Sequence, residues 1–185
     1  MLAKDIAMKI IVLLNKTQQL ETSITPKTKN QANNHKKKEP IVNPHDEYVI
    51  KQALEIKEKT KAELTIMNVG PCSYHTHFIN TLPQDTDNGV RIHNHNLEAE
   101  DPLAIAKNLA KNLTNENANL ILCSRQSNND DNQYISTMVA VLMGWPHVNL
   151  VTKINVTGDL ATIERKINNH QSHIYKINLP VLVGI

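Results

Sequence analysis

Short apolar runs alternate with amphipathic segments along the first three quarters of this chain. The runs at residues 9–14, 62–69, 90–93 and 120–123 are rich in isoleucine, leucine and valine. Runs of this length and composition are typical of strands buried on both faces, as in a parallel sheet. The chain therefore reads as an alternation of strands and helices, which predicts an α/β sheet with right-handed crossovers.

Three segments between or after these runs have apolar residues at helical spacing. Asn43-Pro44 and Asp101-Pro102 each combine an N-cap residue with proline at the first helical position. A third helix is predicted after residue 131 and should end at Gly144, a residue that suits the left-handed C-terminal cap. The predicted buried faces are Val49, Ile50, Ala53, Leu54 and Ile56; Leu103, Ile105, Ala106, Leu109, Ala110 and Leu113; and Ile135, Met138, Val139, Leu142 and Met143.

The pattern changes after Pro146. Residues 148–156, 160–167 and 173–179 alternate apolar and polar positions, with turn signals at 157–159 and 168–170. Such alternation predicts an antiparallel meander with one face exposed. A last apolar run follows at residues 180–185. We expect residues 1–185 to form a single domain. Residues 15–40, by contrast, have almost nothing to bury and predict a long exposed excursion.

Composition narrows the class of protein. The chain has 185 residues, of which 40% are hydrophobic and only 3% aromatic, so its core must be aliphatic. A formal charge of +2 gives no electrostatic case for nucleic-acid binding. The apolar run at residues 10–14 is too short to span a membrane, and no signal-peptide cleavage pattern follows it. Two cysteines make no disulfide framework. We therefore expect a cytoplasmic protein, or one of an organelle matrix.

The most informative stretch runs from residue 120 to residue 146, where a buried strand is followed by a polar loop and a helix. Ligands of open parallel sheets sit outside the carboxyl ends of the strands, and a helix N-terminus suits an anion such as phosphate. The loop contains one arginine and many small hydrogen-bonding side chains. The alternative is an ordinary solvated turn, because polar loops at such junctions are the rule.

Other candidate chemistry is weaker. His75 and His77, and likewise His93 and His95, form His-x-His pairs that could chelate zinc or copper on a strand. Polar loop histidines are the favoured interpretation, because no acid or cysteine completes a site at a convincing spacing. Gly-rich phosphate motifs and nucleophile motifs are absent from the sequence. Cys123, in an apolar run, is most simply a core residue.

Four short motifs follow one another along the chain. They are Asn43-Pro44-x-Asp46-Glu47, Val69-Gly70-Pro71, Arg125-Gln126-x-x-x-Asp130-Asp131-x-Gln133, and Gly144-Trp145-Pro146. A meander from Ile163-Glu164-Arg165 to Leu179-Pro180 comes after them. Each motif alone is weak, but together their order and separations resemble the electron transfer flavoprotein beta subunit family, and the resemblance covers about residues 9–185.

The resemblance implies a Rossmann-like fold of the adenine nucleotide alpha-hydrolase type. It also implies a structural AMP, an alpha subunit that holds most of the FAD in a heterodimer, and electron transfer from acyl-CoA or other dehydrogenases to the respiratory chain. The chain would be a carrier without catalytic residues of its own. By position, the AMP-binding residues would be Leu13, Asn43, Pro44, His45, Asp46, Val69, Ser124, Arg125, Gln126, Ser127, Asn128, Asn129, Asp130, Asp131, Asn132, Gln133, Tyr134 and Ile135.

The chain also departs from the family pattern. Ser124 stands where the family has glycine, Leu13 where alanine is common, and residues 134–136 where it has a small pair. The family continues past the last strand with a loop that docks dehydrogenases and an arm that embraces the alpha subunit. We therefore expect a truncated or divergent member that lacks both. The alternatives are a stand-alone or vestigial adenine-nucleotide-binding module without electron transfer, and a histidine–metal hydrolase.

Overall fold

The computed structural model describes residues 8–14, 44–70, 78–80, 82–93, 101–124, 133–168 and 171–185. The helices are α1 (Pro44–Thr60), α3 (Pro102–Thr114) and α4 (Gln133–Met143). The strands are β1 (Lys9–Leu14), β2 (Glu63–Gly70), β3 (Asn88–His93), β4 (Leu120–Cys123), β5 (His147–Val148), β6 (Val151–Thr157), β7 (Leu160–Asn168), β8 (Gln171–Asn178) and β9 (Val181–Gly184).

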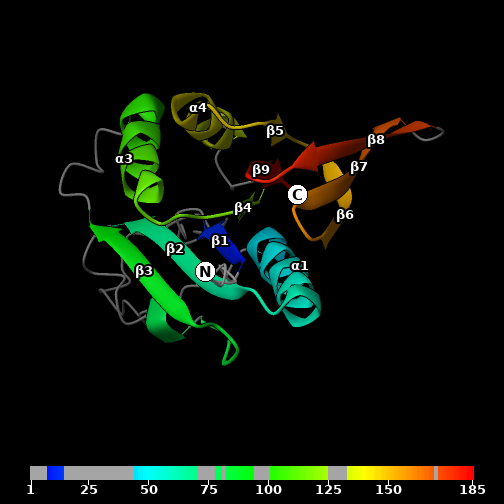
Figure 1. Cartoon of the computed structure of the whole chain (residues 1–185). Coiled ribbons are helices and arrows are strands. Elements are labelled where there is room, and N and C mark those ends of the chain that lie inside the picture. The colour runs from blue at the N-terminus through cyan, green and yellow to red at the C-terminus, as the bar shows by residue number, and fades with distance from the viewer. Residues whose placement is uncertain are drawn as a thin grey trace, which may run out of the picture.

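These strands form two sheets (Figure 1). The first is six-stranded with the order β3-β2-β1-β4-β9-β5, and all its pairs are parallel. The second is a three-stranded antiparallel sheet with the order β6-β7-β8. The α/β class, the Rossmann-like parallel sheet and the C-terminal meander predicted from the sequence are thus confirmed.

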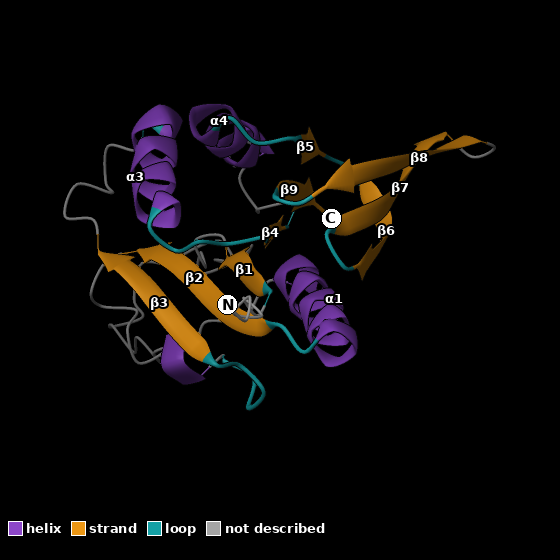
Figure 2. Ribbon diagram, viewed as in Figure 1, coloured by secondary structure: helices purple, strands orange, loops and turns teal. Residues whose placement is uncertain are grey.

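Helices cover both faces of the parallel sheet (Figure 2). On β1, Ile10 and Val12 pack into the cluster that contains α1, and Ile11 and Leu13 pack into the cluster that contains α3 and α4. Successive strand residues point to opposite faces. A strand covered on both sides therefore needs an unbroken apolar run, and this is why residues 9–14 contain one.

The predicted helix ends are present where the structure describes them. The carboxylate of Asp101 accepts a hydrogen bond from the Leu103 amide at 3.0 Å, as an N-cap does. Gly144 has a φ of +67°, and its amide bonds the Val141 carbonyl while the Trp145 amide bonds that of Ala140. This pair of bonds is the Schellman arrangement that ends a helix. Asn43, the other predicted cap, lies outside the described residues, as does the excursion at 15–40.

The C-terminal region differs from the prediction at one predicted strand. Residues 148–156 do not form one strand: His147 and Val148 belong to the parallel sheet, and Leu150, with a φ of +63°, turns the chain before β6. The last apolar run, to which the sequence assigned no sheet, forms β9 and enters the parallel sheet between β4 and β5. It is buried along its whole length, which explains why it does not alternate. Leu103 and Leu142, expected on buried faces, are exposed.

The meander packs against α1 rather than standing apart. Val156, Ala161 and Ile163 are buried in the same apolar cluster as Val49 and Ala53 of α1. The opposite face of the meander is open, as its alternating sequence predicts. The helix α1 therefore lies between the two sheets and connects them through one core.

Candidate functional site

The carboxyl ends of three parallel strands meet at one edge of the six-stranded sheet. Leu13 of β1 pairs in register with Cys123 of β4, and Leu14 pairs with Asn68 of β2. Ser124 directly follows β4, and Val69 directly follows Asn68. The predicted site residues Leu13, Val69 and Ser124, which are far apart in the sequence, are therefore brought together at this carboxyl edge.

Two helices begin at the same edge, because each runs back from a strand end. The first turn of α1 contains Asp46 and Glu47, whereas the first turn of α4 contains no acid. Acidic side chains already satisfy the positive end of the α1 dipole. The N-terminus of α4 is therefore the better place for an anion, and it directly follows the polar loop that the sequence singled out.

Buried polar side chains concentrate at the carboxyl edge. Among the described residues, the buried polar or charged ones are Asp46, Thr65, Asn68 and Ser124, and all but Thr65 lie here. The carboxamide of Asn68 donates a hydrogen bond to the Leu14 carbonyl at 3.3 Å, which ties β2 to the end of β1. Polar groups are costly to bury, so their gathering at one edge of an aliphatic core points to a site.

Asn68 was missed in the sequence. The only signal was a polar residue near the end of a mainly apolar strand, two residues before Gly70. Asparagine inside a strand is uncommon, but nothing in the pattern distinguishes a site residue from an edge residue. The parallel register with Leu14 is what assigns it to the site.

The pKa of the Cys123 thiol is influenced by side chains from the first turns of both α1 and α4. Burial raises the pKa of the Cys123 thiol to about 12; a hydrogen bond with the Ser136 side chain opposes this rise, and the charge of Asp46 adds to it. The thiol also lies 3.4 Å from the Val183 carbonyl of β9. Such a thiol stays protonated at neutral pH, so Cys123 is a core residue rather than a nucleophile, as the sequence predicted.

The predicted site residues that the structure describes differ in exposure, and Val69 is half-buried. Leu13 and Ile135 are buried in the core cluster beneath α3 and α4, so a ligand at the edge would meet their backbone rather than their side chains. His45 and Tyr134 are exposed, Tyr134 with 62% of its surface accessible. Asp46 and Ser124 are buried beside the edge. Pro44 and Gln133 are the first residues of their helices.

The remaining predicted site residues lie outside the described residues, and the structure leaves them as predictions. They are Asn43, Arg125, Gln126, Ser127, Asn128, Asn129, Asp130, Asp131 and Asn132. The same holds for His75, His77 and His95 of the two His-x-His pairs. In the part of the chain that the structure describes, no group of three or more His, Cys, Asp or Glu side chains could hold a metal ion.

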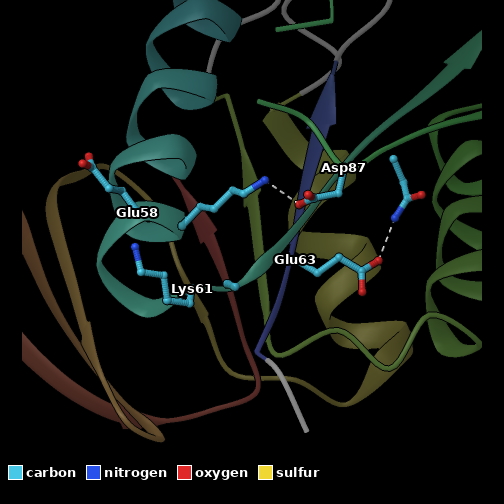
Figure 3. A pocket seen from close by; sticks show the side chains of 7 residues that line it. Glu58, Lys61, Glu63 and Asp87 are labelled. Carbon is cyan, nitrogen blue, oxygen red and sulfur yellow. Dashed lines mark hydrogen bonds and ion pairs between the residues drawn. The ribbon is translucent and has the colours of Figure 1, made fainter. Parts of the chain in front are cut away.

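A second feature lies at the opposite, amino edge of the sheet: an open hollow of about 490 Å³ between the end of α1 and the starts of β2 and β3. Lys57 forms an ion pair with Asp87 at 2.6 Å, and Asn88 donates a hydrogen bond to Glu63 at 2.7 Å. Dashed lines in Figure 3 mark both interactions at the labelled Asp87 and Glu63. The Leu64 amide also donates to Asp87, and these bonds lower the pKa of its carboxyl. The contacts around this hollow therefore join the end of α1 to the starts of β2 and β3.

No described helix is long and apolar enough to cross a membrane. The apolar run at residues 10–14 lies within β1 at the centre of the parallel sheet.

Comparison with known proteins places the chain in a family. Residues 34–185 match the electron transfer flavoprotein domain. The electron transfer flavoprotein subunit beta of Bradyrhizobium diazoefficiens is 30% identical over 146 residues, which are 77% of this chain and 56% of the relative. The human subunit beta is 28% identical over 145 residues, with the same coverage. The mitochondrial subunit beta of Arabidopsis thaliana is 27% identical over 179 residues, which are 95% of this chain and 70% of the relative.

The chain spans about half the length of the first of these relatives, 56% of it. The family model covers far more than half of the chain, the relatives share one name, and the parallel sheet with its added meander agrees with the fold expected from the motifs. This chain therefore belongs to the electron transfer flavoprotein domain family and is similar to its beta subunits.

Proposed function

We propose that this chain holds an AMP molecule at the carboxyl edge of its parallel sheet and serves as the beta-type subunit of an electron transfer flavoprotein. In this proposal it completes a heterodimer with an alpha subunit that binds most of the FAD. The complex carries electrons from dehydrogenases to the respiratory chain, and the flavin supplies the redox chemistry.

The observation that carries the AMP proposal is the contrast between two helix starts at one edge. The first turn of α4 contains no acid and suits a phosphate, whereas the first turn of α1 contains Asp46 and Glu47. A carboxylate repels phosphate but accepts hydrogen bonds from a ribose hydroxyl or an amino group. We therefore orient the nucleotide with its phosphate toward α4 and its nucleoside toward α1. The other contacts are those implied by the family resemblance, from Leu13 to Ile135.

The chain needs no acid, base or nucleophile for this role. The Cys123 thiol, with its pKa raised to about 12, is unsuited to nucleophilic attack. Binding and positioning are sufficient for a subunit that holds a structural nucleotide. We further propose a cytoplasmic location, or the mitochondrial matrix in a eukaryote, in line with the mitochondrial name of the Arabidopsis relative.

Calorimetric titration with AMP tests the site. Gln133→Glu places a negative charge at the first position of α4 and should weaken AMP binding about tenfold, by repulsion of the phosphate. Adenosine, which has no phosphate, should bind both proteins equally. Gln171→Glu is the matched control, because it makes the same chemical change on exposed β8 and should leave AMP affinity unchanged. Absence of heat and of a thermal shift at millimolar AMP would remove the nucleotide from the proposal.

Co-expression with a cognate alpha subunit tests the electron-transfer part separately. A yellow complex containing both chains and FAD is expected. AMP binding by a chain that stays colourless and monomeric in this experiment would instead favour the second candidate, a stand-alone adenine-nucleotide-binding module. The second candidate requires no partner subunit, because the strand ends and helix starts that form the candidate site all belong to this chain.

A further inference from the structure

The outer side of helix α4 is unusually apolar for a surface that water can reach. None of its residues, Gln133–Met143, carries a charge. Ile135 and Val139 are buried in the apolar cluster that also contains residues of α3, whereas Tyr134 is 62% accessible and Val141 is 75% accessible. A helix at the surface ordinarily has charged residues opposite its buried side, and a helix that is apolar all round is ordinarily covered.

The apolar residues on this outer side form one line along the helix. Tyr134, Met138 and Val141 are separated by four and then three residues. Side chains at these spacings form the seam along which two helices pack. Met138 is half-buried, and Leu142, 45% accessible, lies on one flank of the line. The pattern is therefore that of a helix–helix contact, and we call these four residues the α4 seam.

The lack of charge distinguishes among possible occupants of the α4 seam. A strongly acidic or basic partner would find no charge on α4 with which to pair. Helices that lie on a membrane surface have lysines and arginines along their polar face, and α4 has neither. A second copy of the chain brings an equally uncharged surface, so its association buries no unpaired charge and meets no like-charge repulsion.

The dipole of α4 favours one orientation of two such helices. The first turn of α4 contains no acid and its last turn contains no basic residue, so its own side chains do not offset either end of the dipole. In an antiparallel pair the positive end of each helix lies beside the negative end of the other. A two-fold axis perpendicular to the helices produces this arrangement, and two-fold dimers are the commonest oligomers.

We propose that the α4 seam packs against the α4 seam of a second copy of this chain, with the two helices antiparallel. The helix α4 covers the face of the parallel sheet opposite to α1 and the meander, so this contact leaves the meander free (Figure 1). One pair of short helices buries little area, and we expect a Kd on the order of 10 μM. The proposal does not depend on the nucleotide; Tyr134, a predicted AMP contact, stays unchanged in the test.

Sedimentation equilibrium of the full chain without AMP tests the pairing. Val141→Glu places one charge on each side of the contact and should weaken the dimer at least tenfold. Ile79→Glu adds the same charge at another exposed apolar residue, 51% accessible, and should leave the dimer unchanged. Circular dichroism checks that both variants fold, and Val141→Ser, with a loss of about threefold, is a second readout without added charge.

Disulfide formation tests the geometry of the pair. Met138→Cys lies near the middle of the α4 seam, so two copies should form a linked dimer on mild air oxidation, whereas Ile79→Cys should stay monomeric. Both variants also contain Cys72→Ser, and the buried Cys123 thiol, with its pKa raised to about 12, does not compete.

Three outcomes overturn the proposal. They are a chain that remains monomeric up to about 0.5 mM, far above the expected Kd; a dimer that Val141→Glu leaves intact; and equal cross-linking of the two cysteine variants. Dissociation of the dimer by sodium chloride would also contradict it, because a contact without charges is not screened by salt.

Discussion

The strands β4 and β8 show how differently the two sheets of this protein use their residues. β4, near the centre of the parallel sheet, is buried at all four positions, whereas β8, at the rim of the antiparallel sheet, is exposed or only partly buried throughout. β4 has neighbours on both edges and helices on both faces; β8 has one paired edge and one covered face. The comparison separates a part of the chain that is fixed by packing from a part that is largely exposed.

The difference bears on where function lies in each region. In the parallel sheet, rigid buried strands fix the positions of the residues at their carboxyl ends, so the candidate site is built from strand ends and helix starts. In the antiparallel sheet β6 passes to β7 through a turn at Gly158 and β8 leads into β9, so the accessible surface is that of the strands themselves. A substitution inside β4 should therefore destabilise the fold strongly, whereas one at an exposed position of β8 should change stability little.

The largest expected effect breaks the core at β4. Leu122→Ala removes a fully buried side chain from the cluster shared with α1, and should lower the free energy of unfolding by about 3 kcal/mol. Ile174→Ala on β8 should lower it by less than about 0.5 kcal/mol, because that side chain is 68% accessible. Urea denaturation measures both. Equal losses would contradict the distinction between the two sheets.

A smaller effect compares one glycine from each region. Gly144 ends α4 with a φ of +67°, and Gly158 turns β6 into β7 with a φ of +56°. A Cβ at either position would meet no atom within 4 Å, so only backbone strain opposes alanine. Gly144→Ala and Gly158→Ala should each cost about 1 to 2 kcal/mol in thermal or urea unfolding.

The two glycine costs should be alike because the strain is local and independent of burial. Alanine tolerated at Gly158 but not at Gly144 would show that the turn of the meander relaxes where the helix cap does not. That result would sharpen the contrast between the two regions, whereas a loss above that of Leu122→Ala at either glycine would contradict it.

The smallest effect concerns pH at the junction of the two sheets. His147 of β5 is partly buried, and burial lowers the pKa of its imidazole, while a hydrogen bond with Asn149 raises it in part. The unfolded chain then binds a proton more readily than the folded chain. Stability is full above the ordinary histidine pKa, near 6.5, and falls as the pH drops below it.

Urea unfolding measured from pH 8 to pH 5 tests this. His147→Gln should remove part of the acid-dependent loss of stability. Asn149→Ala should make the loss steeper, because it removes the bond that favours the charged form. An unchanged pH slope in His147→Gln would show that the loss has another source.

Much of the fold followed from local pattern. The runs at 9–14 and 120–123 are strands with the predicted bounds, because a strand buried on both faces leaves an unbroken apolar signature. Asp101-Pro102 and Gly144 marked helix ends correctly, because capping chemistry is local. The alternation after Pro146 indicated the meander with one exposed face, because successive residues of a strand point to opposite faces of its sheet.

The placement of distant segments did not follow from pattern. The run 181–184 reads as a buried strand, but nothing local shows that it lies between β4 and β5, since the choice of neighbour is decided by packing over the whole sheet. The sequence also did not separate the two-residue strand β5 from β6, and it predicted a single strand over residues 148–156. The break between them is at Leu150, whose left-handed backbone conformation its residue type does not suggest.

For the candidate site, too, some features followed from the sequence and others only from the tertiary structure. The sequence by itself determined its components: a strand, a polar loop and a helix at residues 120–146, the helix start after Asn43, and the family to which their order belongs. Only the tertiary structure brought Asp46, Asn68 and Ser124 to one edge. Residue type and spacing are local properties of a chain, whereas proximity of side chains arises from strand order and register.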